Sequence, residues 1–512
     1  MGKYSLAYNN PYLVPTDCMP AFINKYWPYL LLLLFAIPLF GMNVHSYHQW
    51  GDDYAQYIKE AQNIAAGRPY YQSNYVFNPL NTIYGPPLYP PGFPLLLTPV
   101  ILYWGLNIKA MLYLITLFLA ILLFVLYSYF RKSSSSSTAV CLSVIVVYCS
   151  YIIDFKQHVL SDIPCLLFVS IYLNLRKGKE LNAIRIIFLA CTAAMAILIR
   201  SQAILLLAAE GLWLAIDIYK RIVARRFSPV ALSPLLIIFF SAGIYFVVNK
   251  LVFHTPQDAV NYYKNFYTWH TDYAGIIYTD TLYFITLIKD IFQHSSHGFI
   301  SRALVSVMSY TGLVSGILGF VFVIRKRILM EDLFFLLMCL LIIITPVHEG
   351  LRFFLPAVPL YILYCKEGIY RLLKKTTQVR PYKIAILLAV IYLALGHEDY
   401  LRAAKVPDYI WSPNTRNDTV AFQYLIDHTG KDDIILFAKP RALTLYTNKT
   451  AMVIAYTASL DIAKKQIDSM HIKYLLWRLE VSEPFFKDYL RYSHSAVDSY
   501  KINDFYTLYK LR

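Results

Sequence analysis

Long apolar runs constrain this chain more than any other feature of its sequence. Stretches of about 17–25 predominantly apolar residues recur along most of its 512 residues, and a helix needs roughly that length to cross the hydrocarbon core of a bilayer. Only 15% of the residues are charged, against about 25% in soluble domains. We therefore predict a polytopic α-helical membrane protein.

About eleven spans are expected within residues 1–396, which we interpret as the transmembrane domain. The first run lacks a small-residue cleavage site, so we expect a retained helix rather than a cleaved signal peptide. The expected spans are Trp27–Val44, Ile108–Phe130, Ala139–Ile153, Val159–Leu175, Ala183–Ile199, Ala203–Ile218, Ser233–Val248, Ala303–Ile324, Leu333–Val347, Phe353–Cys365 and Ile384–Leu395.

The basic residues predict how these spans are oriented. Lys and Arg gather in alternate loops, and loops of this kind face the cytoplasm. The N-terminus is then cytoplasmic and the C-terminus extracytoplasmic. The net charge of +16 resides largely in these loops rather than in a basic stripe among stacking aromatics, so nucleic acid is not expected as a partner. The basic loops contain Arg131/Lys132, Arg176/Lys177/Lys179, Lys220/Arg221/Arg225/Arg226, Arg325/Lys326/Arg327 and Lys366 through Lys383.

Three external segments are long: about residues 45–107, 251–301 and 397–512. The last is expected to form an extracytoplasmic α/β domain with a partly parallel sheet, because strand-like and helix-like stretches alternate in it. The seven cysteines include none in this segment and form no CxxC, so neither a disulfide framework nor a metal cluster is indicated. The expected strands are Asp433–Ala438, Met452–Tyr456 and Lys473–Trp477, and the expected helices are Arg441–Tyr446 and Leu460–Met470.

Two adjacent acids, Asp52 and Asp53, follow the first span. Apolar residues then recur at helical spacing from Tyr54 until Gly67, which predicts an amphipathic helix along the outer membrane surface. One interpretation is structural, because Asp53 and Gln56 fit a capping box and a second acid can complement the helix dipole. The other interpretation is that the pair belongs to the active site of an enzyme.

Further candidates lie at the outer ends of spans. Asp162 is costly at a membrane edge unless it is solvated or paired. Arg200 and Arg352 stand out because the outer loops are poor in cations. Their guanidinium groups could bind a phosphate bidentately, or could instead extend to lipid headgroups or pair with Glu349.

Aromatic residues suggest where a substrate cavity would lie. Tyr89 belongs to the loop Tyr84–Pro94 (YGPPLYPPGFP), whose prolines and glycines make it rigid. His270 belongs to Tyr262–Asp272 (YYKNFYTWHTD), which would suit either a sugar-binding cleft or an interfacial aromatic belt. His348 lies shortly before Arg352.

The stretch Asp53–Tyr70 (DYAQYIKEAQNIAAGRPY) resembles the first external loop of the protein O-mannosyltransferase-like membrane glycosyltransferases, which include the lipid A aminoarabinose transferases. Tyr89–Leu97 (YPPGFPLLL) and Leu351–Leu360 (LRFFLPAVPL) are also similar to that family. The resemblance covers roughly the whole membrane region. It implies a GT-C fold and a protein of the bacterial inner membrane, with its C-terminal domain in the periplasm.

The resemblance also implies an activity. Such enzymes move a sugar, with inversion, from a polyprenyl-phosphate donor to a lipid, glycan or protein acceptor at the outer face of the membrane. Membrane lipid is then a further partner. No cofactor is indicated with certainty, and a divalent metal is left open. The main rival is a transporter or flippase of a lipid-linked glycan, but no clear internal repeat or broken helix with midplane charges supports it.

The resemblance assigns roles to particular residues. The catalytic acid of the family falls on Asp53 through an Asp-x-x-x-Tyr spacing that places Tyr57 in the substrate cavity, and Asp52 is the alternative. Asp162 matches a second acid of the family. Arg352 matches a residue that binds the donor phosphate, and Arg200 is a weaker match. With Tyr57, we expect Tyr89, His270 and His348 to line the cavity.

Overall fold

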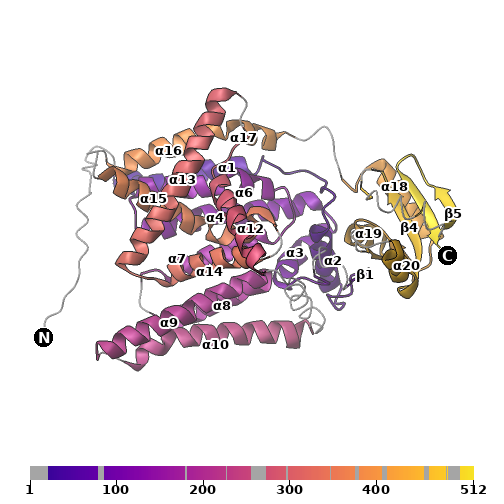
Figure 1. The fold of residues 1–512 in the computed structure, drawn as a ribbon, viewed down its shortest axis with the longest axis horizontal. Helices are drawn as coiled ribbons and strands as arrows, with labels where there is room; N and C mark the ends of the chain where they lie inside the picture. The colour runs from indigo at the N-terminus through magenta and orange to yellow at the C-terminus, as the bar shows by residue number, and fades with distance from the viewer. Residues whose placement is uncertain are drawn as a thin grey trace.

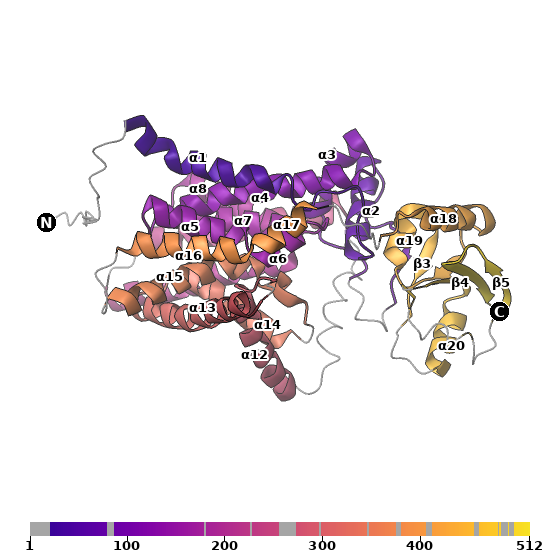
Figure 2. The same ribbon diagram turned by 90° about the horizontal axis from the view of Figure 1, so that it is seen from above.

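The computed structural model describes residues 21–78, 86–178, 181–225, 228–254, 273–295, 298–345, 348–374, 380–405, 412–454, 460–479, 481–482, 490 and 496–511. Most of these residues form a bundle of helices, and a sheet-containing unit of residues 412–511, here called the C-terminal unit, lies at one end of it (Figures 1 and 2). The helix α2 lies at the same end in both views. The expected site at His270 falls outside the described residues.

Helices follow the expected spans, but many of them are short. Within the described part of the chain, four helical stretches are long and apolar enough to cross a membrane: 108–131, 201–223, 233–252 and 299–326. A fifth candidate is the pair α16 and α17, which is bent by 50°. The helices of the bundle are α1 (Ala21–Leu39), α4 (Ile108–Arg131), α5 (Ser136–Val147), α6 (Ser150–Phe155), α7 (Asp162–Arg176), α8 (Ala183–Ile199), α9 (Leu205–Val223), α10 (Ser233–Phe246), α13 (Phe299–Lys326), α14 (Met330–Ile344), α15 (Val358–Lys374), α16 (Pro381–Leu395) and α17 (His397–Ala404).

Glycines allow α13 and α15 to pack closely. A Cβ added at Gly319 would lie 1.9 Å from the carbonyl oxygen of Tyr364, and one at Gly368 would lie 2.0 Å from that of Ser315. Small residues at such contacts let helix backbones approach each other, as is common between membrane helices. The last turn of α13 carries Arg325 and Lys326, which belong to one of the expected basic loops.

Two helices occupy segments that were expected to be external loops. They are α3 (Gly92–Trp104) and α12 (Tyr273–Asp290). The prolines of the α3 region suggested a rigid loop, but Pro94 falls in the first turn of the helix, where a missing N–H costs little. The expected loop at 45–107 is therefore largely helical after residue 91.

The helix α2 (Asp53–Ala65) is where expected, but its polar side does not face water as that of an amphipathic surface helix would. It packs against α3 and against α19 of the C-terminal unit. Its polar side chains are buried too, among them Gln56 and Glu60. Their amphipathic pattern was misleading because these polar groups have tertiary hydrogen-bond partners instead of water.

The C-terminal unit contains a mixed sheet with the strand order β1-β3-β2-β4-β6-β5. The first four strands are parallel to one another, β6 is antiparallel to β4, and β5 is antiparallel to β6. The strands β2 and β4 and the helices α19 and α20 overlap the expected elements, whereas β3 shares only Met452 with its expected stretch. The bounds are β2 (Ile434–Leu436), β3 (Thr450–Met452), β4 (Ile472–Arg478), β5 (Ala496–Lys501), β6 (Tyr506–Leu511), α18 (Arg416–His428), α19 (Pro440–Thr447) and α20 (Leu460–Ser469).

One strand of this sheet comes from the first external loop. The short β1 (Tyr75–Val76) pairs with β3 in parallel. Beside it, the Asn74 side-chain amide donates to the carbonyl oxygen of Asn448 at 2.7 Å, and the Asn78 amide donates to Gln466 at 2.9 Å. The loop that carries the acidic pair is thus joined to the C-terminal unit by backbone and side-chain bonds.

Candidate active site

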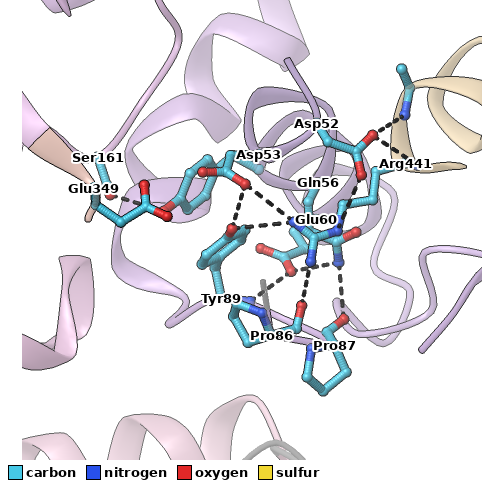
Figure 3. A network of polar contacts seen from close by, with 12 residues as sticks. Asp52, Asp53, Gln56, Glu60, Pro86, Pro87, Tyr89, Ser161, Glu349 and Arg441 are labelled. Atoms are coloured by element: carbon cyan, nitrogen blue, oxygen red, sulfur yellow. Dashed lines mark hydrogen bonds and ion pairs between the residues drawn. The ribbon is translucent and has the colours of Figure 1, made fainter. Parts of the chain in front are cut away.

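The two adjacent acids both contact Arg441 but differ in their other partners, as Figure 3 shows. Asp52 is the N-cap residue of α2, yet its side chain makes no cap hydrogen bond there, so the predicted capping box is wrong. Its Oδ1 instead accepts the backbone N–H groups of Arg441 at 3.1 Å and Ala442 at 3.2 Å. These N–H groups belong to the first turn of α19, where a carboxylate satisfies donors that the helix leaves unpaired. Asp52 therefore caps a helix of the C-terminal unit.

Asp53 has three polar contacts. Its Oδ1 accepts the hydroxyl of Tyr89 at 2.7 Å and Nη1 of Arg441 at 3.3 Å, while its Oδ2 accepts Nη2 of Arg352 at 3.1 Å. Burial raises the pKa of Asp53, but the guanidinium groups of Arg352 and Arg441 and the Tyr89 hydrogen bond outweigh it, so the pKa is lowered overall. Asp53 is thus an ionised carboxylate with 29% of its side chain exposed.

Arg352 connects Asp53 to Asp162. Its Nε donates to Asp162 Oδ1 at 3.3 Å, and Nη1 donates to Glu349 at 3.3 Å. Arg200 donates to the same Asp162 oxygen at 2.6 Å. Asp162 is the first residue of α7, where a negative charge complements the helix dipole. Four of the residues singled out in the sequence therefore form one chain of alternating charges: Asp53, Arg352, Asp162 and Arg200.

Tyr57 and Tyr89 form an aromatic wall beside this chain of charges. Their rings stack with centroids 4.3 Å apart, and Phe93 meets Tyr57 edge-on at 5.0 Å. The Tyr57 hydroxyl lies 2.9 Å from the Ser161 hydroxyl, next to Asp162. Both tyrosines were expected at the cavity, and both lie beside the aspartates.

His348 contacts the helix α12. Its Nε2 is 2.7 Å from Asp280 of α12, and its ring stacks on Tyr283 of the same helix at 4.0 Å. Half of its side chain is exposed (49%). Its recorded partners among the described residues are thus in α12, not among the residues that surround Asp53.

Two site residues escaped the sequence analysis: Arg441 and Glu60. Arg441 lies almost 400 positions after Asp53 and was named only as the first residue of an expected helix. It is 1% exposed. Glu60 follows Gln56 by one helical turn and lies outside the apolar face predicted for this helix. No local pattern marks either residue, because both acquire their partners only through tertiary contacts.

Glu60 is a buried acid that contacts the Tyr89 segment of the site. Its Oε1 accepts the backbone N–H of Tyr89 at 3.0 Å and the Gln56 amide at 2.8 Å. Burial raises its pKa to about 8, although these hydrogen bonds and Arg441 act in the opposite direction. Glu60 is therefore protonated at neutral pH, and it positions the segment that carries Tyr89.

Replacing Glu60 with Gln is expected to stabilise the protein at alkaline pH. The folded-state pKa of Glu60 lies above its unfolded value of 4.5, so folding favours the protonated form, and that stability is lost as the pH rises from about 4.5 to about 8. Gln stays neutral and keeps an acceptor for both hydrogen bonds. Thermal unfolding at pH 5 and pH 8.5 would show a higher midpoint for Glu60→Gln only at pH 8.5. The same difference at both pH values would contradict a titrating Glu60.

The donor set at the site does not fit a divalent metal. Among the described residues, no group of three or more His, Cys, Asp and Glu side chains is arranged to hold a metal ion. The guanidinium of Arg352 lies between the carboxylates of Asp53 and Asp162, and each carboxylate has a second arginine contact. Cationic side chains thus take the places that a bridging ion would need.

Comparisons with known proteins identify the fold. No family model matches the sequence, and no curated protein matches it. Solved structures do match, among them the apo oligosaccharyltransferase of Archaeoglobus fulgidus, at a TM-score of 0.59 and 11% identity over 92% of this chain and 72% of that one. The molecule is thus a membrane protein with the GT-C glycosyltransferase fold.

Within that class, the fold match to one type of enzyme spans nearly the whole of both chains. ArnT from Cupriavidus metallidurans, in its complex with undecaprenyl phosphate, matches with a TM-score of 0.55 and 11% identity, over 95% of this chain and 98% of that one. ArnT is a lipid A aminoarabinose transferase. The likeness confirms the GT-C fold that the resemblance implied. At this identity it concerns the fold alone.

Proposed function

We propose that this protein is an inverting glycosyltransferase that moves a sugar from a polyprenyl-phosphate donor to an acceptor at the outer face of the bacterial inner membrane. The acceptor class is a lipid, a glycan or a protein. The observation that supports this most is the arrangement of Asp53, Arg352, Asp162 and Arg200. It places the ionised, partly exposed Asp53 carboxylate in contact with Arg352, which Asp162 links to Arg200. The solved structures of similar fold include one with undecaprenyl phosphate and one with a dolichol-phosphate.

The reaction needs a proton acceptor and an anion site, and the cluster offers both. The acceptor hydroxyl forms a bond to the anomeric carbon while the bond from that carbon to the phosphate oxygen breaks. Asp53 takes the hydroxyl proton as general base. The electron pair of the broken bond leaves with the polyprenyl phosphate, whose added negative charge is stabilised by Arg352 and Arg200. The acid Asp162 holds these two arginines in place.

The position of the cluster suits a donor with a lipid tail. Asp53 begins α2, at the end of the bundle where the C-terminal unit lies, whereas the turn between α9 and α10 lies at the opposite end (Figure 1). The last turn of α9 carries Lys220 and Arg221, which by the positive-inside tendency would face the cytoplasm. Asp53 and its arginines, at the end away from this cytoplasmic turn, would bind the sugar-phosphate of the donor in water, while the polyprenyl tail of the donor stays in lipid.

A transporter or flippase is the alternative, and the placement of charge favours the enzyme. A carrier of a charged lipid would need ionisable groups along its path near the midplane. Here the Asp53 carboxylate, which is 29% exposed, is grouped with its arginines at one end of the bundle. The comparisons also point to glycosyltransferases rather than to transporters.

Mass spectrometry of envelope glycolipids and glycoproteins tests the proposal. Cells with the protein should carry a sugar modification that cells without it lack, and the species that loses the sugar identifies the acceptor. Accumulation of a polyprenyl-phosphate sugar in the deficient cells would identify the donor. A modification that persists without the protein would count against the proposal.

A further inference from the structure

The C-terminal unit is attached to the membrane part at the candidate active site itself. Asp52 caps α19, and β1 of the first external loop adds a parallel strand to the sheet of the unit. The backbone N–H of Ala451 also donates to the carbonyl oxygen of Asn74 at 3.1 Å. These contacts fix α19 against the N-terminus of α2, only one residue from Asp53.

Arg441 lies in the first turn of α19 and is held on several sides. Its Nη2 donates to the carbonyl oxygen of Pro86 at 2.7 Å. Its guanidinium lies over the rings of Tyr75 at 4.9 Å and Tyr89 at 5.4 Å. A planar guanidinium that stacks and donates in this way loses most of its freedom to move. Its orientation is therefore set by the first external loop, on which the C-terminal unit docks.

The remaining contacts of Arg441 are directed to the proposed chemistry. Its Nη1 donates to Asp53 Oδ1 at 3.3 Å and to the Tyr89 hydroxyl at 3.2 Å, and that hydroxyl donates to the same Asp53 oxygen. Docking does not need these bonds, because Asp52 already caps α19. The other Asp53 oxygen, Oδ2, contacts Arg352. The carboxylate is thus fixed by one arginine from each part of the protein.

We propose that Arg441 is a positioning residue through which the C-terminal unit completes the active site. Docking of α19 on Asp52 places Arg441 against Asp53 and Tyr89, and this contact fixes the orientation of the general base. This inference rests on the proposed function. It assigns the C-terminal unit a part in the chemistry. When the unit is undocked, Asp53 keeps its contact with Arg352 but loses its contact with Arg441.

Carbodiimide labelling tests the contact without an assay of activity. The reagent couples to protonated carboxyl groups, so peptide mass spectrometry of the labelled full-length protein in nanodiscs reports the protonation of Asp53 against pH. Because Arg441 lowers the pKa of Asp53, Arg441→Gln should move the labelling midpoint of Asp53 to higher pH. Lys473→Gln is the matched control, since Lys473 is an exposed cation of the same unit, and it should leave the midpoint unchanged.

Transfer kinetics then test the positioning role. Arg441→Gln should lower kcat about 10–100-fold with little change in the KM of the donor, because a misplaced base slows the chemical step. Arg441→Lys keeps the charge but loses the planar fork, so its labelling midpoint should stay close to that of the wild type while kcat falls about tenfold.

The outcomes separate this inference from the proposed function. A wild-type protein that transfers no sugar defeats the proposed function, while the labelling curves still report whether Arg441 acts on Asp53. A folded Arg441→Gln protein with the wild-type labelling midpoint overturns the inference. If Arg441→Gln does not fold, Arg441→Lys decides, and a wild-type kcat in that variant overturns it as well.

Discussion

Asp53→Asn is expected to lower kcat for sugar transfer about 10²–10⁴-fold, the usual contribution of a general base. An amide keeps the size of the side chain but cannot accept the hydroxyl proton. The variant should fold, because Arg352 keeps its contact with Asp162 and Arg441 keeps its contact with Asp52. Donor KM should change little, since the proposed phosphate site lies on Arg352 and Arg200.

Asp52→Asn separates the two neighbouring acids. An asparagine oxygen can still accept the N–H groups that Asp52 accepts from α19, so this variant should lose less than about tenfold in kcat. Asp433→Asn, which changes a surface ion pair with Lys473, is a further control and should be unaffected. The rates would be measured on purified protein in nanodiscs, with the donor and acceptor found by envelope glycan profiling. A larger loss in Asp52→Asn than in Asp53→Asn would reverse the assignment.

Arg352→Gln is expected to lower kcat about 10²–10³-fold, as the loss of one donor to a developing anion does in other enzymes. The KM of the donor should also rise, because Arg352 would contact its phosphate before as well as during the reaction. Asp162 keeps Arg200 at 2.6 Å, so a buried carboxylate is not left without a cation. The kcat of Arg352→Lys should lie between those of the wild type and Arg352→Gln, since lysine keeps the charge but lacks the planar guanidinium fork.

A cation elsewhere serves as control for Arg352. Arg221 is 43% exposed and pairs with Asp217 one turn earlier on α9. Arg221→Gln should change kcat and KM by less than about twofold, because surface ion pairs contribute little. A kcat within threefold of the wild type for Arg352→Gln would remove Arg352 from the phosphate site.

The sequence predicted the membrane-spanning character of the chain and several members of the site. Apolar runs are local features, so they survive as helices such as α4 and α13. Asp162 stood out because an acid at a membrane edge is costly, and Arg200 and Arg352 stood out because the outer loops are poor in cations. The structure brings all three together with Asp53. Of their partners, Glu349 was expected for Arg352, from which it is three residues away. The contacts of Asp162 with Arg200 and of Arg352 with Asp53 were not predictable, since they join segments that are distant along the chain.

Predictions from local sequence patterns were wrong where tertiary contacts, instead of water, satisfied polar side chains. The spacing of Asp53 and Gln56 predicted a capping box, but the capping carboxylate is Asp52, and the helix that it caps is α19. The polar side of α2 predicted a surface helix, yet Gln56 and Glu60 are fully buried. A helical pattern shows which side chains are polar. It does not show whether water or another segment satisfies them.

The most direct test of the central claim is a comparison of envelope glycans in three strains, which carry the wild-type protein, no protein, and the Asp53→Asn variant at equal abundance. Our account predicts a sugar modification, seen by mass spectrometry on a lipid, glycan or protein, that is present only with the wild type. It also predicts that the lipid-phosphate donor accumulates in the other two strains. Glycan profiles that do not differ among the three strains would contradict it.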